Sequence, residues 1–162
     1  MATFEFKKEY KDLYSPKKPS IIDVPKMSFI MVNGKGNPNT SSEYKEAIEI
    51  LYGLSYTIKM CKMKDFKPTN YFDYVVGPLE GLWWFENDYF DGNVIDRKDE
   101  FVWIMMIRQP DFVTQEVFET AKLNLNKIKP DLNTTLARLE EFEESKCGQI
   151  MHIGAFDDEV VL

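Results

Sequence analysis

The sequence predicts one α+β domain from three observations. Residues 27–33 and 101–108 are short apolar runs rich in β-branched and aromatic side chains, which is typical of buried strands. Residues 41–59 and 114–129 carry apolar side chains at the three- and four-residue spacing of amphipathic helices. The whole chain gives the order strand, helix, strands, two helices, strand, and its 162 residues are enough for a single domain with its own core.

The first 18 residues form a polar lead-in whose aromatic side chains are able to dock on the body of the domain: Phe4, Phe6, Tyr10 and Tyr14. Residues 20–24 could extend into a strand, which Pro25 would interrupt. The first firm strand is 27–33. The glycines, asparagines and proline of 34–39 predict a loop after it.

A helix is expected from about Ser41 to Lys59. Thr40 and Glu43 have the three-residue spacing of a capping box at its start. Its buried face is predicted to carry Tyr44, Ala47, Ile48, Leu51, Leu54, Ser55 and Ile58. A basic, proline-containing connection, 60–70, leads from the helix to the next strands.

Strands are predicted at 71–76 and 81–85, followed by an acidic, turn-rich segment at 86–100. Residues 101–108 have apolar side chains on both faces, so this strand is expected at the centre of a sheet.

A second helix is predicted over 114–129, where Pro130 stops it. Asn133 or Thr134 is expected to cap a third helix, which carries the spaced apolar residues Leu136, Leu139 and Phe142. The last predicted strand is 148–154.

A weak internal repeat links two of these strands. Residues 27–34 and 148–154 both end at a glycine, and each is followed by a segment that reads as a loop entering a helix. The second copy would begin its helix near Asp157 or Asp158 and then stop. We therefore expect a second unit that is incomplete in this chain.

Composition excludes several functional classes. A net charge of −7 argues against direct nucleic-acid binding, which needs a basic face. No apolar run approaches the length of a membrane span, and the start of the chain lacks the pattern of a signal peptide, so a cytoplasmic protein is expected. Cys61, Cys147 and the single His152 are isolated in sequence, so no metal site and no cofactor are expected.

The segment 71–85, YFDYVVGPLEGLWWF, is the best candidate for a binding site. It places several aromatic rings beside one acid, Glu80, and its glycines and proline preclude a helix. Aromatic faces next to a carboxylate suit a flat hydrophobic or cationic aromatic small molecule. The competing interpretation is that these rings only fill a core, because most large apolar side chains are simply buried.

Neighbouring strand positions offer further ligand-binding candidates. Trp83 and Trp84 are adjacent, so they point to opposite faces of a strand, and Trp83 is slightly favoured for the pocket. Trp103 and Met105 share one face of the 101–108 strand and would make an adaptable wall for a flat ligand. Core packing remains the competing explanation for each of them.

Polar candidates complete the predicted site. Glu80 would bind a cation or orient water, or else would be a solvent-facing turn residue. The hydroxyl of Tyr74 would transfer a proton or bind a ligand carbonyl, and Tyr56 on the first helix competes for that role. His152 would be either a pocket residue or a satisfied structural histidine.

Three segments together resemble the GyrI-like small-molecule-binding family: 76–84 (VGPLEGLWW), 103–114 (WIMMIRQPDFVT) and 151–159 (MHIGAFDDE). More narrowly, they look like the stand-alone branch that includes cyclopropanoid cyclopropyl hydrolases. The resemblance covers the chain from about residue 16 onward. Its most specific part is the run that contains Glu80.

The resemblance implies a fold of tandem strand-helix-strand-strand units, as in multidrug-activator effector domains, with a ligand pocket between the units. This bacterial family usually continues beyond the third motif with more of the second helix and two strands, one of which carries an acid facing the pocket. Because those elements are not in this sequence, a second subunit could complete the sheet in a homodimer.

Two functions are therefore expected from the resemblance. The first is binding of flat aromatic or amphipathic molecules in a cleft lined by Trp83, Trp103, Met105, Tyr74 and Glu80, with hydrolysis of cyclopropane-bearing DNA-alkylating compounds as a detoxification. The second is a non-catalytic ligand sensor, a sequestering protein or a modulator of a protein partner such as DNA gyrase. A fragment with no pocket is the third, blander interpretation.

Overall fold

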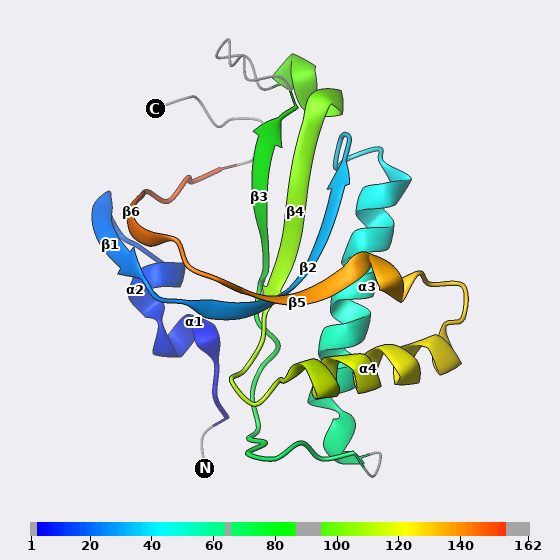
Figure 1. Ribbon diagram of the computed structural model, residues 1–162. Coiled ribbons are helices and arrows are strands. Elements are labelled where there is room, and N and C mark those ends of the chain that lie inside the picture. Colours follow the sequence, from blue (N-terminus) through cyan, green and yellow to red (C-terminus); the bar gives the residue numbers. More distant parts are fainter. Residues whose placement is uncertain (1–2, 64–65, 87–94, 155–162) are drawn as a thin grey trace.

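A computed structural model describes residues 3–63, 66–86 and 95–154 of the chain, and shows an α+β fold (Figure 1). Six strands are present in this part: β1 (Ser20–Val24), β2 (Met27–Lys35), β3 (Leu79–Phe85), β4 (Phe101–Arg108), β5 (Ala137–Phe142) and β6 (Ser145–Gln149). The helices are α1 (Phe6–Glu9), α2 (Lys11–Tyr14), α3 (Ser42–Lys59) and α4 (Gln115–Ile128). Short 3₁₀ turns occur at Cys61–Met63, Ile95–Glu100 and Thr134–Leu136.

Four strands form one antiparallel sheet in the order β3-β4-β2-β5, and α3 and α4 cover one of its faces. β4 lies between two partners, as its apolar residues on both faces predicted. Its odd-numbered residues, such as Trp103, pack toward the helices, whereas Met106 packs on the opposite face. The sheet therefore separates a large helix-side core from a smaller cluster on the other face.

The sheet contains a repeat, although not the one expected. The segments β2–α3–β3 and β4–α4–β5 each place their first strand at the centre of the sheet. Each then places its second strand at an edge, against the first strand of the other segment. The prediction that 27–34 and 148–154 begin two equivalent units is wrong. The strand β6, where the second unit was expected to begin, lies outside this sheet and pairs with β1. The expected helix start near Asp157 or Asp158 lies outside the described residues.

The third predicted helix is wrong. Only Thr134–Leu136 forms a short 3₁₀ turn, capped by the Asn133 side chain, and Ala137–Phe142 continues as strand β5. The three-residue spacing of its leucines suits a helix in isolation. The open edge of β2 supplies an antiparallel ladder instead, so tertiary pairing overrides the local pattern.

Other boundaries also differ from the prediction. The expected strand at 71–76 is reduced to a single bridge between Tyr74 and Phe4. The strand predicted at 148–154 is shifted, since β6 ends at Gln149. The lead-in forms α1 and α2.

The two long helices are confirmed within one or two residues at each end. At the start of α3 the cap is Ser41 rather than Thr40, because the Ser41 Oγ accepts a hydrogen bond from the Tyr44 N–H at 3.3 Å. Thr114 caps α4 in the same way, through the Val117 N–H. None of the helices in the described ranges is long and apolar enough to cross a membrane.

The two small strands continue the edge of the main sheet. Val24, the last residue of β1, pairs with Ser145. Met27, three residues later at the start of β2, pairs with Phe142, so the register continues from β1–β6 into β2–β5 without a slip. Pro25 interrupts this ladder because it has no N–H to donate. On the opposite strand, Ser145 adopts a left-handed conformation, with a φ of 58°.

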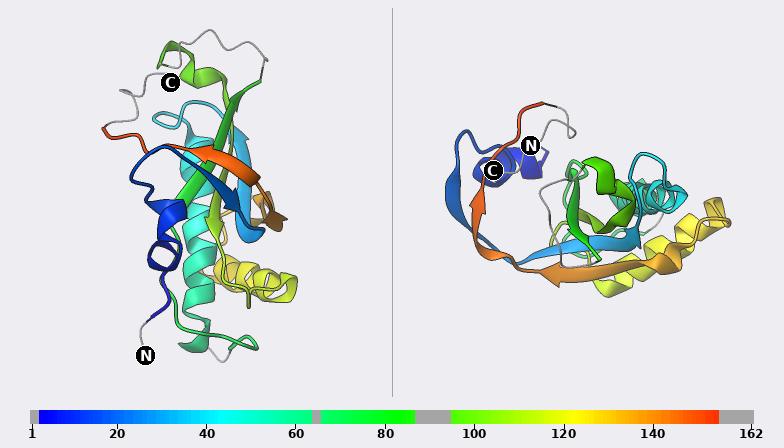
Figure 2. Two further views of the ribbon diagram at one scale, coloured as in Figure 1. Left: turned by 90° about the vertical axis from the view of Figure 1, so that its left-hand side faces the viewer. Right: turned by 90° about the horizontal axis from the view of Figure 1, so that it is seen from above.

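This bend changes the shape of the molecule. Figure 2 shows β1 and β6 curling away from the four-stranded sheet and toward the short helices α1 and α2. This β1–β6 pair, the curled ribbon, lies together with α1 and α2 over the face of the sheet that α3 and α4 leave uncovered.

We predict that Gly34→Ala lowers the free energy of unfolding by about 2 kcal/mol or more, as overpacking does in a filled core. Gly34 on β2 faces Trp103 across the ladder, and a methyl group there would lie 2.2 Å from the nearest atom of the indole ring. Urea unfolding measures the change.

The matched control is Gly148→Ala on β6, where an added methyl group would meet nothing within 4 Å. Equal stabilities for the two variants would show that Trp103 can move aside, and would contradict the packing argument.

Candidate functional site

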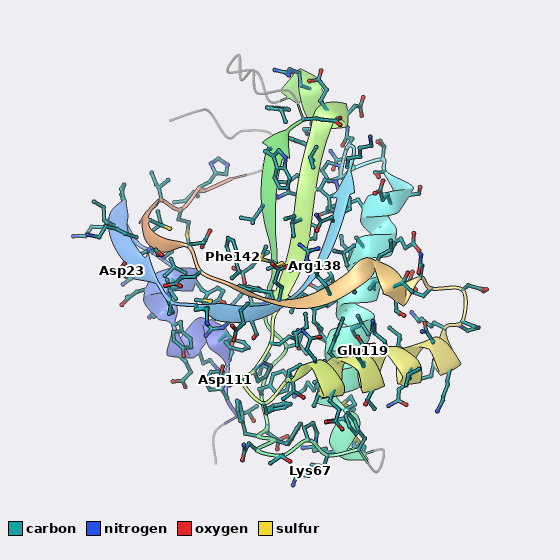
Figure 3. All side chains as sticks on the ribbon, in the orientation of Figure 1. Asp23, Lys67, Asp111, Glu119, Arg138 and Phe142 are labelled. Atoms are coloured by element: carbon teal, nitrogen blue, oxygen red, sulfur yellow. The ribbon has the colours of Figure 1, made fainter. Side chains whose placement is uncertain are left out.

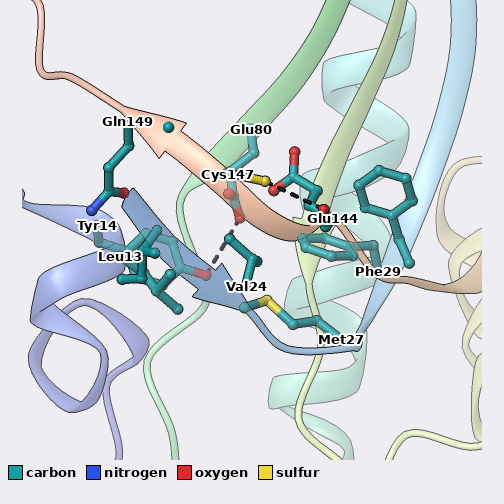
Figure 4. A pocket seen from close by; sticks show the side chains of 12 residues that line it. Leu13, Tyr14, Val24, Met27, Phe29, Glu80, Glu144, Cys147 and Gln149 are labelled. Carbon is teal, nitrogen blue, oxygen red and sulfur yellow. Dashed lines mark hydrogen bonds between the residues drawn. The ribbon is translucent and has the colours of Figure 1, made fainter. Parts of the chain in front are cut away.

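A cavity of about 250 Å³ lies between the curled ribbon, α2 and the sheet face that the long helices leave uncovered (Figure 4). Its wall combines apolar side chains with one acid from the sheet, Glu80. The lining residues are Leu13, Tyr14, Ile22, Val24, Met27, Phe29, Glu80, Phe142, Glu144, Cys147, Gly148 and Gln149. Small-molecule sites combine apolar side chains with a few polar groups, and here polar and apolar atoms share the exposed lining about equally.

Glu80 reaches this cavity because of its position in β3. It pairs with Met106, so its side chain lies on the same face of the sheet as Met106. Burial raises the pKa of the Glu80 carboxyl from 4.5 to about 7. The positive charge of Arg108 opposes this rise, and the negative charge of Glu144 adds to it.

Tyr14 approaches Glu80 from the last turn of α2. Its O–H donates toward the Glu80 Oε2 at 3.5 Å, a long and therefore weak hydrogen bond (Figure 4). Burial, and next the charge of Glu80, raise the pKa of the Tyr14 phenol to about 12. The phenol therefore keeps its proton at neutral pH and remains a donor.

Arg108 adjoins these two residues on the same face of the sheet. It is the direct cross-strand neighbour of Phe29, which lines the cavity, and it is only 7% exposed. Its guanidinium lies 4.5 Å from the ring centre of Phe6 and 4.4 Å from that of Tyr10, as cation–π contacts.

Of these three candidates the sequence singled out Glu80, and it did not point to Tyr14 or Arg108 as site residues. Tyr14 was expected only to dock on the body of the domain. The signal for Arg108 was available, since it is the one charged residue in the otherwise apolar strand 101–108. A charge at the end of a buried strand calls for a partner or a function.

The structure separates Glu80 from the residues expected to share its cleft. Trp103, Met105 and Tyr74 are each no more than 3% exposed and lie in the core between the sheet and the helices. The expected single cleft is therefore corrected. Because side chains alternate along a strand, Glu80 and Met105 face opposite sides of the sheet.

The two adjacent tryptophans are divided in the same way. Trp83 packs against the helix-side core, where its ring contacts Tyr44 and Phe101. Trp84 occupies the face of Glu80 and is 43% exposed. The sequence slightly favoured Trp83 for the pocket side, but the pleat of β3 places Trp84 there instead. Trp84 nevertheless does not line the cavity.

The remaining candidates lie away from the cavity. Tyr56 is an exposed residue of α3 whose ring stacks on Tyr52 at 6.3 Å. His152 lies beyond the end of β6 and is exposed. Within residues 3–63, 66–86 and 95–154, no three His, Cys, Asp or Glu side chains are grouped so that they could hold a metal ion.

The arrangement of Glu80, Tyr14 and Arg108 has a definite chemical capability. A carboxyl with a pKa of about 7 is present in both forms at neutral pH, so it can accept or donate a proton. Tyr14 supplies a hydroxyl donor beside it, and Arg108 supplies a permanent positive charge. Such a set can transfer a proton and stabilise negative charge on a bound molecule.

We predict that Glu80→Gln makes stability less dependent on pH. Since the folded-state pKa is raised, the native protein holds this proton more tightly than the unfolded chain, and stability is lost as pH rises from about 4.5 to 7. Gln does not titrate. Relative to the wild type, the variant should therefore gain on the order of 2 kcal/mol between pH 5 and pH 8, measured by urea unfolding.

Glu116→Gln, at an exposed position on α4, is the control and should follow the wild-type pH dependence. A parallel pH dependence for Glu80→Gln and the wild type would mean that Glu80 titrates normally.

Comparison with known proteins places the chain in a family. No protein-family profile matches it, and no curated protein sequence matches it. Three solved structures from Listeria innocua are each 46% identical to it: two hydrolases, with TM-scores of 0.84 and 0.88, and an uncharacterized conserved protein, with a TM-score of 0.88. The matches cover 96%, 97% and 96% of this chain and 77%, 75% and 74% of theirs. The chain therefore belongs to the same family as these Listeria innocua proteins.

Proposed function

We propose that this protein is a hydrolase that acts on a flat, largely apolar small molecule, with Glu80 as the group that moves the proton. The observation that carries the proposal is a partly buried carboxyl in a cavity, with a pKa raised to about 7 and a tyrosine hydroxyl beside it. The names of two relatives as hydrolases support the reaction class.

The cavity suits an apolar ligand of modest size. Phe29, Phe142 and Met27 line it from the sheet, and Leu13 and Val24 line it from the covering elements. Its volume of about 250 Å³ is slightly below the usual range for ligand pockets, so a few fused rings would fill it. Aromatic and thioether side chains adapt well to flat molecules.

The resemblance of the sequence supports a narrower substrate class. Glu80 lies within 76–84, the segment that most specifically resembles the GyrI-like family and its cyclopropanoid cyclopropyl hydrolases. We therefore extend the proposal to a GyrI-like fold and to molecules that carry a strained cyclopropane conjugated to a carbonyl. Detoxification of DNA-alkylating compounds would be the corresponding role.

The proposed reaction adds one water molecule across the strained ring. Glu80, as a carboxylate, accepts a proton from water while the water oxygen bonds to a ring carbon. The ring carbon–carbon bond breaks, and its electron pair moves into the conjugated carbonyl, whose oxygen becomes an anion. That oxygen takes up a proton, and Glu80 gives its own proton to solvent.

The tyrosine hydroxyl in the proposed site is that of Tyr14 rather than that of Tyr74. The Tyr74 ring is buried in the helix-side core, whereas the Tyr14 hydroxyl points at Glu80 in the cavity. As a neutral donor, Tyr14 keeps the carboxylate oriented toward water.

The first test is turnover of a compound with a cyclopropane conjugated to a carbonyl, followed by chromatography. We expect many product molecules per protein, and a loss of about 100-fold or more in kcat/KM for Glu80→Gln. Glu140→Gln, which removes an acid paired with Arg138 on the same sheet face, should leave the rate unchanged. Product that stops at one molecule per protein would identify a sequestering protein instead.

The pH dependence tests the role of Glu80 as a base. Because the carboxylate is the active form, kcat/KM should rise with pH and level off above about 7. A rate that falls through the same range would assign Glu80 as an acid and contradict the proposed step.

A further inference from the structure

Arg108 carries a buried charge that the protein leaves without a counter-ion. None of the ion pairs among the described residues includes it. Its Nη1 is buried, and no described residue accepts a hydrogen bond from it. Aromatic rings flank the guanidinium, and these stabilise a cation less than a carboxylate would.

Arg108 lies beside the cavity, next to residues that line it, and is not itself part of the lining. Phe29 faces it directly across the ladder, and Glu80 is a diagonal neighbour through Met106, so all three lie on one face of the sheet. Arg108 opposes the effect of burial on both groups: its charge lowers the pKa of Glu80, and a side-chain hydrogen bond and then its charge lower the pKa of Tyr14. The guanidinium therefore acts on two of the polar groups that line the cavity.

A buried, unpartnered donor is costly, and natural proteins keep such groups mainly where a ligand or a function requires them. Evolution of stability alone would favour an apolar residue here, as buried charges can often be replaced without loss. The two flanking rings hold the guanidinium in place, which suits a binding group more than a structural one.

We propose that Arg108 binds an anionic oxygen of the ligand, so that the cavity selects apolar molecules that carry such an oxygen, or that develop one during reaction. This inference rests on the proposed function and deepens it. In the hydrolysis described above, the carbonyl oxygen that gains negative charge as the ring opens is the atom that Arg108 would hold. The same charge disfavours a cationic ligand.

Two fluorescent probes with one skeleton test the selectivity directly. 1-Anilinonaphthalene-8-sulfonate carries an anionic sulfonate, and N-phenyl-1-naphthylamine has the same rings without it. We expect the wild type to bind the sulfonate probe more tightly, and Arg108→Met to lower this preference about tenfold or more while leaving the affinity for the neutral probe within about threefold. A good charge-assisted contact is worth this much.

A second arginine on the same sheet face provides the control. Arg138 on β5 (Figure 3) faces Met31, and its guanidinium is already engaged by hydrogen bonds to Glu140 and Asn33. Arg138→Met removes the same charge from the protein, so it should leave the preference between the probes unchanged. If both variants lose the preference equally, net charge rather than Arg108 explains it, and the proposal fails.

A measurement on the wild type does not depend on how the variants fold. The chain has three arginines, Arg97, Arg108 and Arg138, so their guanidinium signals can be resolved by nitrogen-15 NMR. The sulfonate probe should shift the Arg108 signal and leave Arg138 in place, and the neutral probe should shift Arg108 much less. An Arg108 signal that ignores the sulfonate probe would overturn the proposal, as would a wild type that binds neither probe.

The binding ratio and the NMR shift are measured without turnover. A protein that shows the expected preference but hydrolyses nothing would retain the inference on Arg108 and lose the proposed reaction. Turnover with no preference between the probes would have the opposite meaning.

Discussion

The candidate site depends on one constraint, which is the continuous register that links the β1–β6 pair to the β2–β5 pair. β1–β2 and β5–β6 form one antiparallel ladder, and the bend at Pro25 and Ser145 turns its β1–β6 part over the sheet. Without this turn, the face that carries Glu80 would be open to water. The pKa of Glu80 would then stay near that of an ordinary carboxyl, because burial is the main cause of its rise.

The pleat of the sheet divides two different tasks between neighbouring residues. On one face, Trp103 and its neighbours fill the space beneath α3 and α4 and hold the strands in register. On the other face, Glu80 and Arg108 occupy positions that the helices do not cover. The stability of the domain and the chemistry of the cavity are therefore carried by alternate residues of the same strands.

The electrostatics of the cavity are set by competition between burial and charge. Arg108 favours the carboxylate form of Glu80, yet burial raises the pKa to about 7 because the two groups do not form an ion pair. A direct salt bridge would have fixed Glu80 as an anion and quenched Arg108. In the proposed reaction, this separation leaves Glu80 able to titrate and Arg108 able to bind an anionic oxygen.

The sequence by itself determined the α+β class, the two long helices and the central strand 101–108, because each of these depends on local pattern. It could not determine that 137–142 is a strand, since the partner edge of β2 lies more than a hundred residues away along the chain. Nor could it bring Tyr14 to Glu80 or leave Trp103 out of the cavity. Those outcomes follow from which face of the sheet the helices cover and from where the ribbon bends, and both are decided only when distant segments pack together.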